Sequence, residues 1–156
     1  MEISGLPVHV LVVHAAVVFT PLAVISAILF AVVPKWRYLT RWPTGVLVVV
    51  STVAVWVAKL SGPDLQKDRG LPDALIRTHE QRGDVLAWVM LGFLVVGAYA
   101  VLTLGGPSGL VSGSGARTAA APWAERVVPV ALVVLGIVVL VWVVLTGDAG
   151  ARATWG

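Results

Sequence analysis

Four long apolar runs alternate with three shorter polar segments along this chain. The runs cover residues 8–33, 44–60, 84–104 and 127–145. A helix needs about 20 mostly apolar residues to cross the hydrocarbon core of a bilayer. The pattern therefore predicts an all-α fold, an integral membrane four-helix bundle, with residues 1–156 forming a single four-span transmembrane domain. The second run is short, so we expect its helix to include neighbouring residues.

The composition supports a membrane protein and excludes several other classes. Hydrophobic residues make up 58% of the chain and charged residues 12%, whereas soluble domains carry about 25% charged residues. The mean hydropathy is +0.94. The absence of cysteine excludes disulfides, iron–sulfur clusters, thiolate metal sites and covalently attached haem. The net charge is only +3, so we predict the lipid bilayer as partner and no nucleic acid.

The first apolar run is expected to remain in the mature protein. A cleaved signal peptide would begin with cations, but Glu2 is acidic. The run is also longer than the roughly 7–15 apolar residues of a signal peptide.

The first connection predicts the orientation of the chain in the membrane. Its residues 34–43 hold three cations and no acid, interleaved with aromatic residues: Lys35, Arg37, Arg41, Trp36, Tyr38 and Trp42. Such a mixture is typical of a membrane interface, and cations without acids favour the cytoplasmic side. We therefore expect a multi-pass protein of the cell's inner (plasma) membrane, with the N- and C-termini external.

The other connections differ in character. Residues 61–83 carry much of the charge, and Pro72 followed by Asp73 predicts a helix start that runs on into the third span. Residues 105–122 are rich in Gly, Ser and Ala, which predicts a flexible linker without chemistry. At the end of the second run, Lys59 is expected to reach the interface or to pair with Asp64.

All three histidines are predicted to lie on one side of the membrane. His9 and His14 open the first span and His79 precedes the third, and four spans place these segments at the same face. An ionisable residue inside a span is a functional hypothesis by default. His9 and His14 are about 140° apart around a helix, so they do not form a chelate from one helix, which normally uses i and i+4.

The helical phase selects His14 and His79 as the candidate ligands. His14 shares a face with Val18, Pro21 and Ile25, and His79 shares one with Gly83, Leu86, Met90 and Gly97. Small residues along one face of a helix allow a flat ligand or the backbone of another helix to come close. We expect His14 and His79 to converge and bind b-type haem or a divalent metal, with His9 as a weaker candidate. Alternatively, the histidines are half-solvated and bind loop carbonyls.

Several segments resemble a known family. They are "GLPVHVLVVH" at the start, "SGPD" after the second run, His79, and the closing "TGDAGARATWG". Together they are similar to a bacterial family of four-span membrane proteins, domain of unknown function 2231. The resemblance implies a fold and a membrane location but no activity. This chain has Val10 where the family tends to have proline, and it lacks the family's closing histidine.

Three functional hypotheses follow. The first is a redox-associated protein that binds haem or a metal. The second is a non-catalytic structural or accessory subunit of a larger membrane complex. The third is a transporter, which would need a homo-oligomer or other membrane subunits to enclose a pathway. The sequence contains no Ser-His-Asp array, Walker loop or HExxH motif, so we predict no catalytic residue and no enzyme.

Overall fold

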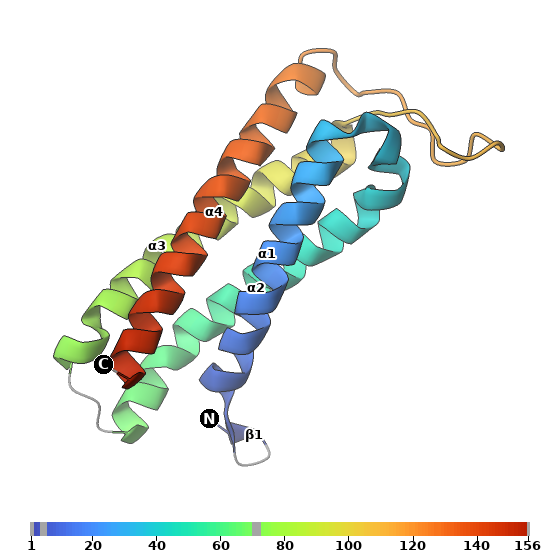
Figure 1. Cartoon of the computed structure of the whole chain (residues 1–156). Coiled ribbons are helices and arrows are strands. Elements are labelled where there is room, and N and C mark those ends of the chain that lie inside the picture. The colour runs from blue at the N-terminus through green and yellow to red at the C-terminus, as the bar shows by residue number, and fades with distance from the viewer. Residues whose placement is uncertain (1, 4–5, 70–72, 156) are drawn as a thin grey trace.

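The computed structural model describes residues 2–3, 6–69 and 73–155, and it contains four long helices that lie side by side (Figure 1). The helices are α1 (Val8–Val32), α2 (Arg37–Arg69), α3 (Asp73–Thr103) and α4 (Ala124–Trp155). Each is long and apolar enough to cross a membrane. The predicted all-α membrane bundle is therefore confirmed.

Successive helices run in opposite directions, which separates the molecule into two ends. The start of α1, the end of α2, the start of α3 and the end of α4 lie at the lower end in Figure 1. The turn between α1 and α2 and the linker between α3 and α4 lie at the upper end. Two short antiparallel strands, β1 (Glu2–Ile3) and β2 (Leu6–Pro7), precede α1.

Helix ends follow local chemistry more than hydropathy. α1 ends before Pro34 because proline disfavours the helical conformation in the residue that precedes it. A short 3₁₀ helix, η1 (Pro34–Trp36), leads directly into α2. α2 extends beyond the apolar run 44–60 at both ends, as its shortness predicted. α3 likewise begins well before the third run, although Pro72 itself lies outside the described residues.

The four helices pack in a ring in which each contacts two neighbours. α1 packs against α2 and α4, and α3 packs against the same two helices. Glycines bring the backbones close at two crossings: a Cβ on Gly97 would lie 3.4 Å from Val48, and one on Gly136 would lie 3.0 Å from Val24. Small residues are typical of helix contacts in membranes, where dispersion and close approach replace the hydrophobic effect.

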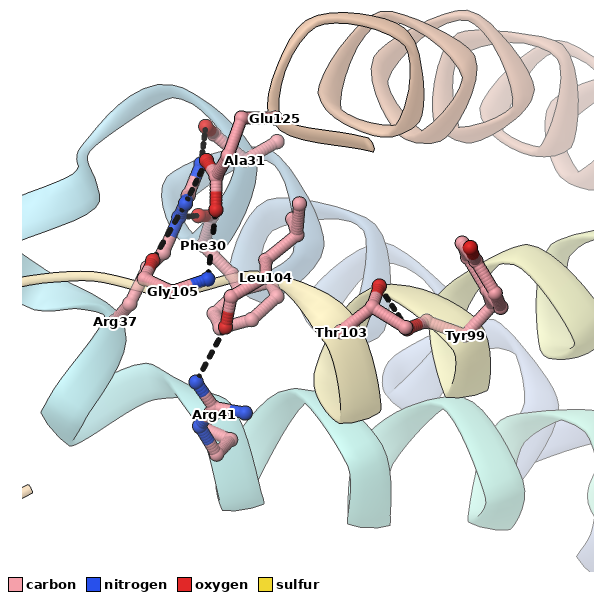
Figure 2. Close-up of polar contacts among 9 residues, drawn as sticks. All are labelled: Phe30, Ala31, Arg37, Arg41, Tyr99, Thr103, Leu104, Gly105 and Glu125. Carbon is pink, nitrogen blue, oxygen red and sulfur yellow. Dashed lines mark hydrogen bonds and ion pairs between the residues drawn. The ribbon is translucent and has the colours of Figure 1, made fainter. Parts of the chain in front are cut away.

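Two buried arginines hold the upper end together (Figure 2). Arg37 is 2% exposed and Arg41 is 8% exposed. Both guanidinium groups lie near the ring of Phe30, at 5.7 and 5.8 Å from its centroid. Both cations are therefore buried within the protein rather than exposed, while their position at the membrane interface stays a prediction.

These arginines cap the ends of α1 and α3. Arg37 donates to the carbonyls of Phe30, Ala31 and Gly105 at 2.9, 3.1 and 2.6 Å, and it pairs with Glu125 at 2.6 Å. Arg41 donates to the carbonyls of Val101 and Leu104. The last carbonyls of a helix have no partner within it and carry partial negative charge. Arginine satisfies both needs, which explains why the cations are buried.

The linker is tied to the bundle at its ends. Gly106 and Arg117 form an antiparallel bridge with N–O distances of 2.8 and 3.0 Å, and the Gly105 amide donates to Glu125 at 2.6 Å. A Cβ on Gly106 would lie 2.6 Å from the carbonyl oxygen of Pro34. Residues 109–116 between these anchors are exposed, although a Cβ on Gly109 or Gly115 would lie 2.7 or 3.0 Å from Tyr38. The linker that the sequence predicted to be flexible is thus held at both of its ends.

Candidate functional site

A cavity of about 440 Å³ lies among the four helices toward the lower end. Its volume falls in the range of roughly 300–1,000 Å³ that is usual for small-molecule and cofactor sites. Most of the lining is apolar, and it includes Val13, Val55, Leu86 and Val143. The titratable side chains that line it are His9, Lys59, His79, Glu80 and Asp84.

His9 lies on the interior face of α1 and is held by α2. Its Nδ1–H donates to the carbonyl oxygen of Ala58 at 2.8 Å, with the Ser61 hydroxyl at 3.3 Å. Gly62 leaves room for the ring, because a Cβ there would lie 3.5 Å from His9 Cε1. The orientation of the imidazole is therefore fixed by the neighbouring helix.

His79 is held by α4 in the same way. Its Nδ1–H donates to the carbonyl oxygen of Thr146 at 3.0 Å. Gly150 follows four residues later, as Gly62 follows Ala58. A Cβ on Gly150 would lie only 3.0 Å from His79 Cε1 and Nδ1. Each histidine is thus bound by a carbonyl on the next helix and faced by a glycine one turn further on.

The hairpin of α1 and α2 and the hairpin of α3 and α4 also match in the positions that are buried or line the cavity. The offset in residue number between Ala58 and Thr146 also matches three buried residues of α2 with three buried residues of α4. These are Thr44, Ser51 and Val55, which correspond to Leu132, Val139 and Val143. The shift that carries His9 onto His79 carries Val13 onto Gly83, and both line the cavity. The cavity therefore lies between two hairpins, each of which supplies one histidine.

The two imidazole rings approach each other across the cavity. Their centroids are 6.5 Å apart and their planes are nearly perpendicular, at 88°. Because Nδ1 of each ring donates to a carbonyl, Nε2 is the nitrogen that carries the lone pair in the neutral tautomer. Histidines that bind metals usually have their second nitrogen oriented by such a carbonyl.

The structure brings His79 together with His9 rather than with His14. His14 is exposed, and its Nδ1 lies 2.6 Å from the carbonyl oxygen of Val10 in its own helix. The face that it shares with Val18 and Ile25 is the outer one, since these are 56% and 53% exposed. The expected convergence of His14 with His79 is therefore corrected.

A charged pair lines the same cavity. Lys59 Nζ lies 3.1 Å from Asp84 Oδ1, which joins α2 to α3. The ammonium also lies over the indole rings of Trp56 and Trp88, at 5.2 and 5.9 Å from their centroids. Lys59 thus pairs with Asp84 and not with Asp64, as we had considered.

Two further observations bear on the ligand. In the part of the chain that the structure describes, no group of three or more His, Cys, Asp or Glu side chains is arranged to hold a metal ion. The Thr146 hydroxyl is buried and has no hydrogen-bond partner among the described residues, although Thr146 lines the cavity. The site therefore offers two imidazoles, an ion pair and a hydroxyl within an apolar wall.

The fold and the site together define a class. Four apolar helices that pack as a bundle, with polar groups gathered in a cavity near one end, are those of a four-span integral membrane protein. The model of a family described as "Predicted membrane protein (DUF2231)" matches residues 5–156, and the chain belongs to this family. The resemblance noted in the sequence is thereby confirmed. No curated protein and no solved structure matches the chain.

Proposed function

We propose that the protein binds b-type haem in the cavity, with the iron between Nε2 of His9 and Nε2 of His79. The observation that carries this proposal is the pair of imidazoles, each oriented through Nδ1 by the neighbouring helix. A metal bound by imidazole lies about 2.0–2.1 Å from each nitrogen, as for zinc. Rings with centroids 6.5 Å apart are close enough for one metal to be bound by both.

Haem fits the site better than a bare divalent ion does. A bare ion usually needs four or more protein ligands or waters, and the described residues include no such set. A porphyrin brings nitrogen ligands of its own to the iron, so His9 and His79 would suffice to hold it. The apolar lining of the cavity suits the macrocycle.

The proposed coordination favours a role in electron transfer. If His9 and His79 both held the iron, they would shield it from oxygen and substrate, and the iron would supply one-electron redox chemistry. Hydrogen bonds made by the histidine ligands, together with burial, tune the reduction potential of such an iron. Here the Ala58 and Thr146 carbonyls would supply the hydrogen bonds. With the N-terminus external, the haem would lie near the external surface.

The test is the absorbance spectrum of protein purified in detergent from cells supplied with haem. We expect the Soret band and the sharp reduced bands of haem with two histidine ligands. His9→Gln and His79→Gln should each abolish them, because glutamine keeps an N–H for the carbonyl but provides no nitrogen ligand for iron. His14→Gln, on the exposed face, is the matched control and should retain the spectrum.

Protein that neither carries haem nor takes up added haemin would contradict the proposal. Stoichiometric metal without porphyrin would replace it with a bare metal site. The absence of both ligands would favour the accessory-subunit hypothesis. Circular dichroism of each variant separates the loss of ligand from the loss of fold.

A further inference from the structure

Among the described residues that line the cavity, Lys59 is the only lysine or arginine, and it is held in a defined position. Its side chain is 25% exposed, and its ammonium group contacts Asp84 and two indole rings. A cation that is already ordered loses little conformational entropy when it binds an anion. Lysine is also a common ligand of anionic groups, which it binds as a compact charge.

The carboxylate that faces Lys59 is more exposed than Lys59 itself. The side chain of Asp84 is 59% exposed, so it can turn into water at small electrostatic cost. An anionic group that enters the cavity can therefore take its place on the ammonium. Glu80 also lines the cavity and is exposed, so a second carboxylate competes from the same helix.

The two hairpins differ at the position of Lys59. The shift that relates α2 to α4 carries Lys59 onto Gly147, which also lines the cavity. A Cβ on Gly147 would have no atom within 4 Å, so this side is open space. One side of the site thus offers a cation, while the opposite side offers room without charge. A ligand with acidic groups along one edge and an apolar opposite edge matches this asymmetry.

From these contacts we infer that Lys59 binds a carboxylate at the edge of the ligand, displaces Asp84 from the ion pair, and so fixes which way round the ligand lies. The inference rests on the proposed haem site and names the propionate edge of the porphyrin as the group that Lys59 recognises. Lys59 is a binding and orienting residue here, and His9 and His79 remain the ligands of the metal.

The experiment compares iron protoporphyrin IX with its dimethyl ester, which has the same macrocycle without carboxylates. Each is titrated into the full-length protein in detergent, and its dissociation constant is measured by absorbance. The ratio of the two constants is compared between variants, so differences in detergent partitioning cancel. Wild-type protein should prefer the diacid about ten-fold or more, as expected for a charge-assisted hydrogen bond.

Four variants test the role of the charge. Lys59→Met should abolish the preference for the diacid, so that the ratio of the two dissociation constants approaches one. The loss should come from weaker binding of the diacid and not from a change in binding of the ester. Lys59→Arg should retain most of the preference. Asp84→Asn should raise affinity for the diacid, because it removes the competing carboxylate. Lys67→Met is the matched control: it removes an exposed lysine of the same helix that does not line the cavity, and it should behave as wild type.

The outcomes separate this inference from the proposed function. An equal ratio in wild type and Lys59→Met would overturn the role of Lys59, while a spectrum with two histidine ligands for both porphyrins would leave the haem site standing. Failure to bind either porphyrin would overturn the haem site itself and this inference with it.

Discussion

At the scale of single residues, the packing face of α1 is marked by small residues. Ala23 and Ala27 are buried, as is Thr20, and stepping back along the helix from them leads through Ala16 and Val13 to His9. Membrane helices show little hydrophobic asymmetry, because the lipid is as apolar as the core. Hydropathy therefore could not distinguish the face of His9 from that of His14.

The stripe predicted for His79 was right for the same reason. Its members Leu86 and Met90 are buried, and Gly83 lines the cavity. The glycines along α3 mark its interior face. On α1 the interior face is marked by alanines instead. The sequence thus predicted one of the two facing histidines correctly. The other candidate, His14, lies on the exposed face of α1 with Val18 and Ile25.

A residue-scale prediction concerns Arg37. Arg37→Met should lower the free energy of unfolding by about 3–5 kcal/mol, because it leaves Glu125 and several helix-end carbonyls without their donor. Lys35→Met, which removes an exposed cation two residues earlier, should change it by about 0.5 kcal/mol or less. Denaturant unfolding followed by circular dichroism measures both. Similar values for the two variants would show that the upper end is not held by Arg37.

At the scale of elements, hydropathy located the four spans but not the full helices. α2 and α3 continue through charged segments, since polar residues at a helix end lower hydropathy without breaking the helix. The burial of Arg37 and Arg41 escaped prediction because a cation near a span is normally interfacial. Their carbonyl partners on α1 and α3 are distant in sequence, and no local pattern reveals them.

The glycine that faces His79 gives a prediction for α4. Gly150→Ala should weaken haem binding several-fold, because its Cβ would lie 3.0 Å from the imidazole and the ring must move away from the Thr146 carbonyl. Gly92→Ala is the control, since its Cβ would meet no atom within 4 Å and Gly92 does not line the cavity. Absorbance titration with haemin gives both affinities. Equal affinities would mean that the ring is not fixed by this glycine.

The linker gives a second prediction at this scale. Deletion of Gly109–Gly115 should change the melting temperature little, because these residues lie in an exposed stretch and loop length has a weak effect on stability. Gly106→Ala should lower it clearly, because its Cβ would lie 2.6 Å from the Pro34 carbonyl oxygen. Thermal unfolding in one detergent compares the two. A large decrease for the deletion would show that the exposed part is packed in the membrane-bound protein.

At the scale of the whole molecule, an even number of spans places both termini at one end of the bundle, and Figure 1 shows this arrangement. Which side of the membrane that end faces stays a prediction from the cations of residues 34–43. Arg37 and Arg41 are buried. The orientation is therefore predicted chiefly from the exposed cations at the upper end, Lys35 and Arg117 of the linker.

The orientation can be tested without disturbing the buried arginines. A reporter inserted at Ser112, in the exposed linker, should report the cytoplasmic side, and a reporter after Gly156 should report the external side. Activity of the reporters in intact cells gives the answer. The reverse pair of signals would place the histidine cavity at the cytoplasmic surface.

The relation between the two hairpins also bears on how such a chain could arise. A single hairpin with one histidine would build a two-histidine cavity simply by pairing with an identical copy. The shift that carries Ala58 onto Thr146 carries Arg37 onto Glu125, so an identical pair would set like charges against each other where this chain has an ion pair. A chain in which the two hairpins differ in sequence is free of that constraint. One hairpin can then carry a cation and the other its counterion. The cavity between them need not be symmetric, so it can distinguish the two edges of its ligand.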